Sequence, residues 1–327
     1  MLTLSQIRDV HDAVDDQWRS PVADAVAAAW GVGTGQALYW RSSASHVVVV
    51  PAGADPRGVL YVRWVPERAA GARGFARGTL LHARLSADAA DVAPLVPSTS
   101  GRLLERLTTP LGPVLAAVVR RVDGDETDVD DLTVDLAAAW GRGLGRFHLA
   151  AARYEDVVEP APVSPLAALA RSPDTDVADA ARVLADALGR GGPARTVVGH
   201  GDYELDNLRW RGWRPVCFDL DEAALRPAAA DVASAVRDLL GPDPAHPAHP
   251  RLLDGFLDGY SRTSGTTVTH DALLPHVGAL AAAHLADLDR ILDTAEDAAW
   301  LTDLGDRLRA HAAGQREVLV ASAAALA

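Results

Sequence analysis

The sequence predicts an α+β protein, with an antiparallel sheet near the N-terminus and a larger, mainly helical part after it. Short apolar runs separated by turns occupy residues 37–64, whereas residues 132–151 and 271–326 have the spacing of apolar residues that is typical of helices. The chain has 327 residues, of which 49% are hydrophobic, enough for one large domain or two ordinary ones. We predict a first domain over residues 1–104 and a second over residues 105–327.

The elements are expected in the following order. Two helices precede Trp30, and the second begins at Ser20-Pro21, a typical helix start. Strands follow at residues 37–40, 46–50 and 59–64, and then a helix around residues 75–85. A connection rich in Pro, Ser and Ala (residues 88–101) leads to a last strand at 102–107. Further helices are predicted at residues 132–151, 176–188, 252–260 and 271–326.

A polar loop at residues 199–207 is the most informative stretch of the sequence. It contains the pattern H-x-D-x-x-x-x-N, formed by His200, Asp202 and Asn207. Short apolar runs at 196–198 and 216–218 predict strands on either side of the loop, and Asp219 follows the second one. This order of residues is typical of a catalytic loop for phosphoryl transfer, followed by a metal-binding acid.

The residue types suit that chemistry. A carboxylate at Asp202 can accept a proton from an attacking hydroxyl group or orient it. Mg²⁺ is a hard cation that prefers oxygen ligands, which the amide of Asn207 and the carboxylate of Asp219 can supply. In another interpretation, His200, Asp202 and Asp219 only cap a turn and a helix. Four such residues at this spacing favour the catalytic interpretation.

On these motifs the chain resembles the aminoglycoside phosphotransferase and choline kinase-like (APH) phosphotransferase family, a branch of the protein-kinase-like fold. The family loop typically reads H-G-D-x-x-x-x-N, as His200-Gly201-Asp202 and Asn207 do here, and its metal acid is followed two residues later by a second acid, here Asp221. The resemblance is strongest over residues 197–235 and can be traced over about 36–240. It implies a bilobal fold with a small sheet-containing N-terminal lobe and a larger helical lobe.

The resemblance also implies roles for residues outside the loop. His200 would support the catalytic loop, and Asp231 would cap a helix and brace that loop. Asp221 would bind a second metal or support the first. The nucleotide would be held by a cation on the third strand, by a hairpin over its phosphates, and by a hinge backbone beside its base. The matching residues are Arg63 for the cation, Ser42, Ser43 and Ser45 for the hairpin, and Glu105 and Leu107 for the hinge.

One part of the family pattern is missing. The helix after the third strand should offer a glutamate that holds the phosphate-binding cation, near Gly78 or Thr79, but residues 75–85 contain none. Glu67 is the nearest glutamate and lies in an expected turn. Either another acid anchors Arg63, or the grip on the phosphates is weakened.

The composition limits the kinds of partner that the protein is expected to bind. Arg and Lys number 31 against 44 acidic residues, and every one of the basic residues is arginine. The net charge of −13 argues against a nucleic-acid partner, and it fits either a cationic acceptor or simply a soluble acidic surface. The single cysteine, Cys217, is expected to pack in the core, and a cytoplasmic location fits this cysteine usage. No apolar run is long enough for a transmembrane helix, and the first residues lack the pattern of a secretion signal.

The sequence therefore predicts an Mg²⁺-dependent phosphotransferase that moves the γ-phosphoryl group of ATP or GTP to a hydroxyl of a small molecule. Two alternatives stay open. One is a catalytically silent relative that binds a nucleotide or metabolite as a regulatory protein, which the missing glutamate favours. The other is a kinase for protein serine or threonine, which the short segment between Asp219 and Asp231 disfavours.

Overall fold

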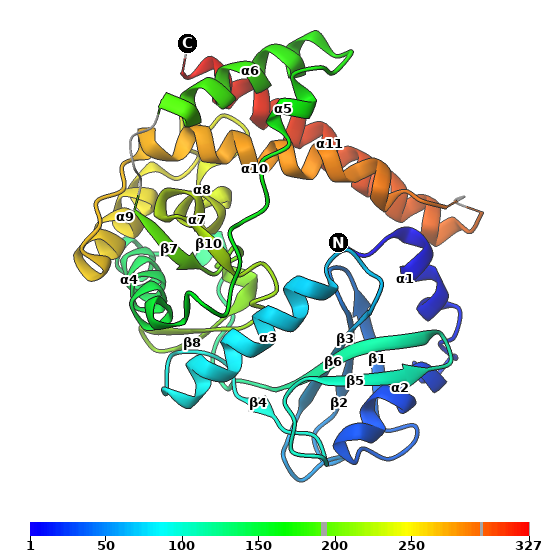
Figure 1. The fold of residues 1–327 in the computed structure, drawn as a ribbon. Helices are drawn as coiled ribbons and strands as arrows, with labels where there is room; N and C mark the ends of the chain where they lie inside the picture. The colour runs from blue at the N-terminus through cyan, green and yellow to red at the C-terminus, as the bar shows by residue number, and fades with distance from the viewer. Residues whose placement is uncertain (191–194, 295–296, 327) are drawn as a thin grey trace. The chain divides into compact units, whose positions relative to one another are not determined.

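The computed structural model describes residues 1–190, 195–294 and 297–326 (Figure 1). The chain forms two compact units. The first, here called the sheet unit, comprises Met1–Asp123, Phe218–Glu222 and Arg290–Leu301. The second, here called the helical unit, comprises Gly124–Cys217, Ala223–Asp289 and Thr302–Ala327.

The sheet unit is built on a six-stranded antiparallel sheet. Its strands lie in the order β1-β2-β3-β6-β4, and β5 pairs with the first half of β6. The three strands predicted first are confirmed, each within two residues of its expected ends. The bounds are β1 (Leu38–Ser42), β2 (His46–Val50), β3 (Leu60–Pro66), β4 (Leu95–Val96), β5 (Glu105–Thr109) and β6 (Gly112–Arg120).

Alternating side chains of β3 point to opposite faces of the sheet. Val62 and Trp64 join a buried apolar cluster with α2 (Pro21–Ala27) and the short helix η1 (Ala28–Trp30). Val65 lies in a second cluster with Phe75 of α3 (Ala72–Ala87). Since side chains alternate along a strand, Arg63 shares the α3 face, where its guanidinium lies 5.5 Å from the centroid of the Phe75 ring.

The N-terminal helix α1 (Leu4–His11) begins with a capping box, in which Thr3 and Gln6 satisfy each other's backbone N–H groups. Its first turn also contacts the segment Arg290–Leu301 of the same unit. Asp293 accepts hydrogen bonds from the backbone N–H and the hydroxyl of Ser5, at 2.9 and 2.6 Å. A carboxylate at this helix end is favoured by the free N–H groups and by the helix dipole.

The boundary between the units differs from the predicted one. We expected a division at residue 104, but β5 and β6 form a hairpin of the sheet unit, and the chain enters the helical unit after Asp123. Pro110 and Leu111 form the turn of that hairpin, and Gly112 directly after it has a φ of 108°. The apolar run at residues 113–119 thus adds a central strand that the sequence analysis missed.

The helical unit is organised around the pair α4 and α9. Four glycines let the two helices approach closely: a Cβ at Gly141 of α4 would lie 2.0 Å from the carbonyl oxygen of Phe256, and one at Gly259 of α9 would lie 2.1 Å from that of Ala138. Gly145 and Gly255 make similar close approaches. The helix bounds are α4 (Val134–Ala151), α5 (Leu166–Leu169), α6 (Thr175–Arg190), α7 (Ala228–Ala235), α8 (Arg237–Leu240), α9 (Pro250–Ser264), α10 (His270–Ile291) and α11 (Ala299–Ala324).

A second apolar cluster joins α5 and α6 to the two long C-terminal helices. Leu184 of α6, Ala281 of α10 and Leu319 of α11 are among its buried members. The predicted helices over residues 132–151, 176–188 and 252–260 are confirmed within a few residues. The C-terminal helical stretch is confirmed as α10 and α11, while residues 295–296 lie outside the described residues. None of the described helices is long and apolar enough to cross a membrane.

Two short strand pairs frame the polar loop. β7 (Thr196–Gly199) pairs with β10 (Ala224–Pro227), and β8 (Leu208–Arg211) forms a hairpin with β9 (Arg214–Cys217). Between β7 and β8 lie the loop residues and the short helix η4 (Leu205–Asn207). Two further short helices are η2 (Val129–Asp131) and η3 (Ala152–Tyr154). Cys217 at the end of β9 is buried, as predicted.

Candidate active site

The polar loop is held by its backbone. Asp231, a buried residue of α7, accepts a hydrogen bond from the N–H of His200 at 2.9 Å and another from the N–H of Gly201 at 2.7 Å. The hydroxyl of Ser234 donates to the carbonyl oxygen of Gly201 at 2.6 Å. Gly201 itself has a φ of 87°, in the left-handed region that favours glycine. The loop is therefore fixed at the two residues just before Asp202.

Asp231 braces the loop as predicted, but it does not cap a helix end. It lies inside α7, and its carboxylate also accepts a hydrogen bond from Nε2 of His148 at 2.8 Å. Burial by itself would raise the pKa of Asp231, but the hydrogen bond from His148 and the nearby charge of Arg226 hold that pKa well below its usual range. Asp231 thus stays ionised and serves three donors at once.

His200 supports the loop from the core side. Its ring is fully buried and lies 5.3 Å from the ring centroid of Phe147 and 5.4 Å from that of Tyr203. Its Nδ1 accepts a hydrogen bond from the N–H of Asp202 at 3.3 Å. The contacts fit the structural role that the sequence analysis gave to His200.

Both carboxylate oxygens of Asp202 have protein partners. Nδ2 of Asn207 donates to Oδ2 at 2.8 Å and to the carbonyl oxygen of the same residue at 2.9 Å. The Arg237 guanidinium donates to Oδ1 at 2.9 Å. The amide nitrogen of Asn207 is used in this way, so its Oδ1 is not the atom that bonds to Asp202. The orientation gives Asn207 an oxygen that can serve as a metal ligand.

Arg237 and Glu204 were missed by the sequence analysis. Arg237, the first residue of α8, bridges Asp202 and the carboxylate of Glu204. Burial and the negative charge of Asp202 raise the pKa of Glu204 to about 7, against the attraction of Arg237. An arginine six residues after the bracing acid was visible in the sequence, but only the turn between α7 and α8 directs it to Asp202.

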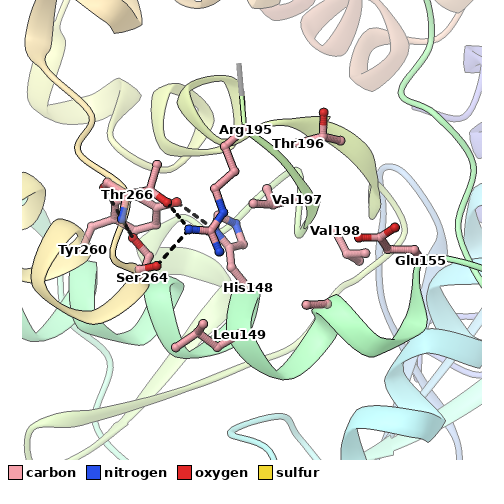
Figure 2. Close-up of a pocket in the computed structure, with 11 residues that line it drawn as sticks. His148, Leu149, Glu155, Arg195, Thr196, Val197, Val198, Tyr260, Ser264 and Thr266 are labelled. Carbon is pink, nitrogen blue, oxygen red and sulfur yellow. Dashed lines mark hydrogen bonds between the residues drawn. The ribbon is translucent and has the colours of Figure 1, made fainter. Parts of the chain in front are cut away.

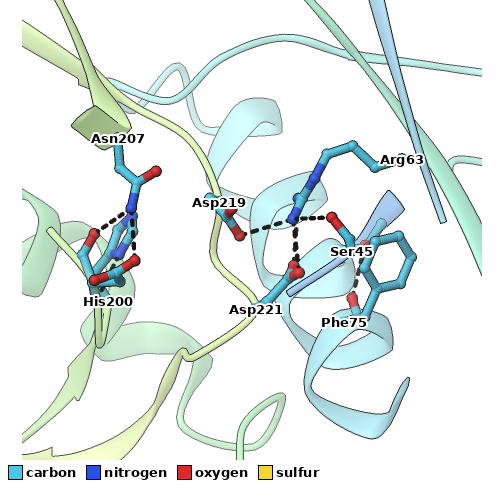
Figure 3. Close-up of polar contacts among 9 residues, drawn as sticks. Ser45, Arg63, Phe75, His200, Asn207, Asp219 and Asp221 are labelled. Carbon is cyan, nitrogen blue, oxygen red and sulfur yellow. Dashed lines mark hydrogen bonds and ion pairs between the residues drawn. The ribbon is translucent and has the colours of Figure 1, made fainter. Parts of the chain in front are cut away.

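The sheet unit contributes a second polar cluster (Figure 3). Nη2 of Arg63 donates to Asp219 at 2.8 Å and to Asp221 at 2.7 Å, and it lies 3.3 Å from the hydroxyl of Ser45. Nη1 of Arg63 lies 3.4 Å from the other oxygen of Asp221. The two carboxylates outweigh burial and raise the pKa of Arg63 further. Burial and the charge of Asp219 raise the pKa of Asp221 to about 7, although Arg63 opposes this.

Asp219 has a backbone φ of 66°, which is unusual for a residue with a side chain. Such a conformation costs roughly 1 kcal/mol or more and persists where the surrounding structure imposes it. It fixes the direction of the Asp219 carboxylate at the start of the segment Phe218–Glu222. The strain is located at the residue for which the sequence predicted metal binding.

The three serines of the turn between β1 and β2, Ser42, Ser43 and Ser45, make different contacts. Ser42 accepts a hydrogen bond from the hydroxyl of Tyr39 at 3.0 Å and lies 2.7 Å from Nδ1 of His46. Ser43 donates its N–H to the carbonyl oxygen of Ser45, which closes the turn between β1 and β2. Of the three serines, Ser45 is the one that contacts Arg63. The role of the hairpin as a cover for phosphates stays a prediction.

Glu105 and Leu107 are placed differently from the expected hinge. Both belong to β5, and the buried carboxylate of Glu105 accepts hydrogen bonds from Ser98 at 2.6 Å and from Ser100 at 2.5 Å. Leu107 packs against the main apolar cluster of the sheet unit. The chain first passes from the sheet unit into the helical unit after Asp123, beyond the end of β6. The contact of Glu105 and Leu107 with a nucleotide base stays a prediction.

A cavity of about 190 Å³ lies in the helical unit, between the end of α4, β7 and α9 (Figure 2). Arg195 at its rim donates to Thr266 at 2.7 Å, and the Tyr260 hydroxyl lies 3.0 Å from Nδ1 of His148. His148 in the wall of this cavity also contacts Asp231, the residue that holds the polar loop. The described lining includes none of the residues predicted to bind the nucleotide or the metal.

The residues fit the kind of metal site that the sequence predicts. Mg²⁺ is usually held by one or two carboxylates together with the phosphates of a substrate. Within residues 1–190, 195–294 and 297–326, no group of three or more His, Cys, Asp or Glu side chains could hold a metal by itself. The amide oxygen of Asn207 and the carboxylate of Asp219 are each a type of ligand that Mg²⁺ prefers, and their role as metal ligands stays a prediction.

The comparisons agree with the motifs. A model of the Phosphotransferase enzyme family (APH) matches residues 82–266, more than half of the chain, and the protein belongs to this family. A comparison with curated protein sequences gives no match.

Solved structures confirm the protein-kinase-like fold of the family. The amicoumacin kinase hAmiN, in complex with AMP-PNP, Ca²⁺ and Ami, is 18% identical with a TM-score of 0.63 and covers 85% of this chain and 87% of its own. A microcompartment-associated aminopropanol kinase is 17% identical with a TM-score of 0.60, at 86% and 90% coverage. The spectinomycin phosphotransferase APH(9)-Ia, in complex with ADP and spectinomycin, is 12% identical with a TM-score of 0.62, at 90% and 95% coverage.

Proposed function

We propose that this protein transfers the γ-phosphoryl group of ATP to a hydroxyl group of a small molecule, with Mg²⁺ as the metal. The observation that carries the proposal is the carboxylate of Asp202, held at Oδ1 by Arg237 and at Oδ2 by Asn207 within the family's loop. ATP is favoured over GTP because the similar structures are complexes with AMP-PNP and with ADP.

In this reaction the acceptor oxygen forms a bond to the γ-phosphorus while the bond from that phosphorus to the bridging oxygen of ADP breaks. Asp202 takes the proton of the acceptor hydroxyl or orients that hydroxyl for attack. Mg²⁺, when bound, would neutralise charge on the phosphates, and Asn207 and Asp219 would hold it. Arg63 would contact the phosphates, and Ser45 on the β1–β2 turn would lie beside it.

The acceptor is proposed as a small molecule on the family membership, since the similar structures are named as kinases of amicoumacin, aminopropanol and spectinomycin. The net charge of −13 fits an acceptor that carries an amine. The argument for a silent relative loses its main support, because Arg63 does have acidic partners in Asp219 and Asp221.

The first test is calorimetric titration with AMP-PNP, with and without Mg²⁺. We expect the natural protein to bind this nucleotide roughly tenfold or more tightly with Mg²⁺ than without it. In Asp219→Asn the two affinities should become equal, because the metal loses its charged ligand. Asp9→Asn, an exposed change in the same unit, should behave like the natural protein. No binding of AMP-PNP in either condition would contradict the proposed function.

A second expectation concerns Arg237. Replacing it by methionine keeps much of the side-chain length but frees Oδ1 of Asp202 from its donor. We expect kcat to fall about 10–100-fold, because misplacement of a catalytic group by even 1 Å is costly, while KM for ATP stays within a few-fold. Steady-state kinetics with an accepted substrate measures both values.

The matched control is Arg262→Met, which removes an exposed arginine paired with Asp258 on α9. Its kcat should equal that of the natural protein. An unchanged kcat in Arg237→Met would show that Asn207 alone positions Asp202.

A further inference from the structure

The cation of the third strand lacks the helix glutamate that the family pattern provides. The sequence of α3 contains no acidic residue at all. Glu67, the nearest glutamate, is paired with Arg106 at 2.8 Å instead. Arg63 is nevertheless largely buried, with 12% of its side chain exposed, so its charge requires a partner within the fold.

The structure shows why a glutamate does not fit at Gly74 or Gly78 of α3. A Cβ at Gly78 would lie 2.2 Å from the carbonyl oxygen of Leu220, and a Cβ at Gly74 would lie 2.5 Å from that of Asp221. The helix is therefore packed directly on the backbone of the segment Phe218–Glu222, and no longer side chain fits at either glycine. This close packing brings Asp221 to the place where it can meet Arg63.

We propose that Asp221 is the anchor of Arg63 and replaces the missing helix glutamate, so that it positions the phosphate-binding cation and is not a metal ligand. The inference rests on the proposed function and assigns a different role to Asp221 than the family pattern implied. Asp221 reaches both terminal nitrogens of Arg63, whereas Asp219 reaches one. The carboxylate of Asp221 is as buried as Arg63, at 12% exposed, while that of Asp219 is 24% exposed.

These contacts indicate different roles for Asp219 and Asp221. A carboxylate that bonds to both ends of a guanidinium fixes its plane as well as its position. Asp219, with its imposed backbone conformation and greater exposure, is the acid suited to a metal. When Asp219 serves the metal, Asp221 is the acid that remains with Arg63.

The test is calorimetric titration with ADP at pH 8, once in EDTA and once with Mg²⁺, for Asp221→Asn and Asp219→Asn. We expect Asp221→Asn to weaken ADP binding about tenfold in both conditions, because the loss acts through Arg63 and not through the metal. Asp219→Asn should weaken binding only with Mg²⁺. Asp221→Glu, which keeps the charge, should recover part of the loss in both conditions.

Two outcomes would overturn the anchor. If Asp221→Asn lost ADP affinity only with Mg²⁺, Asp221 would be a metal ligand. If it lost no ADP affinity in either condition, the ion pair with Arg63 would not contribute to nucleotide binding. If Asp221 had only a structural role, Asp221→Asn would bind ADP in EDTA as tightly as the natural protein. Asp221→Glu would then have no loss of affinity to restore.

A thermal-melting cycle keeps the test independent of nucleotide binding. Asp221→Asn should lower Tm more in the natural protein than in an Arg63→Met protein, because the pair is already broken in Arg63→Met. Equal losses would overturn the pairing itself. If the natural protein binds no ADP in either condition, the proposed function and the positioning role fail together, and this cycle still decides whether Asp221 anchors Arg63.

Discussion

Replacing Asp202 by alanine should lower the rate of phosphoryl transfer roughly 10²–10⁴-fold, the range expected for removal of a general base. The backbone of the loop is held by Asp231 through His200 and Gly201, and not by the side chain of Asp202. The variant should therefore fold normally. Single-turnover measurement of ADP release, beside the circular dichroism and melting curve of the variant, separates lost chemistry from lost structure.

Asp206→Ala provides the matched control for this variant. Asp206 lies in the same loop, on the short helix η4, and is exposed. Its removal changes the charge of the loop by the same amount, and the turnover should stay within a few-fold of the natural protein. Retained turnover in a folded Asp202→Ala protein would contradict the proposed mechanism.

The largest effect on stability is expected at Asp231. Its side chain is fully buried and accepts hydrogen bonds from His148 and from the N–H groups of His200 and Gly201. Asp231→Ala leaves these donors without an acceptor in the core. We expect the free energy of unfolding to fall by about 3–5 kcal/mol, as for a buried pair that loses one partner. Urea denaturation followed by tryptophan fluorescence measures this loss.

Asp258→Ala is the control for that measurement, because Asp258 is exposed and pairs with Arg262 on the surface of α9. Its effect should lie within about 0.5 kcal/mol of zero. A loss of less than about 1 kcal/mol in Asp231→Ala would show that other acceptors or water replace the carboxylate, against the arrangement described here. If Asp231→Ala cannot be produced in folded form, Asp231→Asn keeps one acceptor oxygen and should show a smaller loss.

Local signals account for what could be predicted. The alternating strand that carries Arg63, the loop from His200 to Asn207 and the acid Asp219 are all short patterns, in which a few neighbouring residues define the chemistry. Their order along the chain was enough to identify the family and the fold, and the family match over residues 82–266 confirms it. The expected strands β1, β2 and β3 followed from short apolar runs that are separated by turns.

Features that depend on distant pairing were missed or misplaced. The strand β6 was missed because the Pro-flanked turn before residue 112 returns the chain as a hairpin, and a hairpin of that kind resembles a strand that leads into a loop. Arg237 is hydrogen-bonded to Asp202 although 35 positions separate the two residues in the sequence. The direction of the Arg237 side chain depends on where α7 ends. Asp231 was expected at a helix end, but its partners come from α4 and from the loop that follows β7.

The sequence by itself determined the family, the order of sheet and helices, and the residues that carry the proposed chemistry: Asp202, Asn207, Asp219 and Arg63. Only the tertiary structure decided which groups hold them. Asp221 meets Arg63 because two glycines of α3 let the helix approach the backbone of Leu220 and Asp221. The physical reason is that a reacting group is recognisable by its own type and spacing, whereas its supporting partner can be any acid or base that packing brings within hydrogen-bond distance.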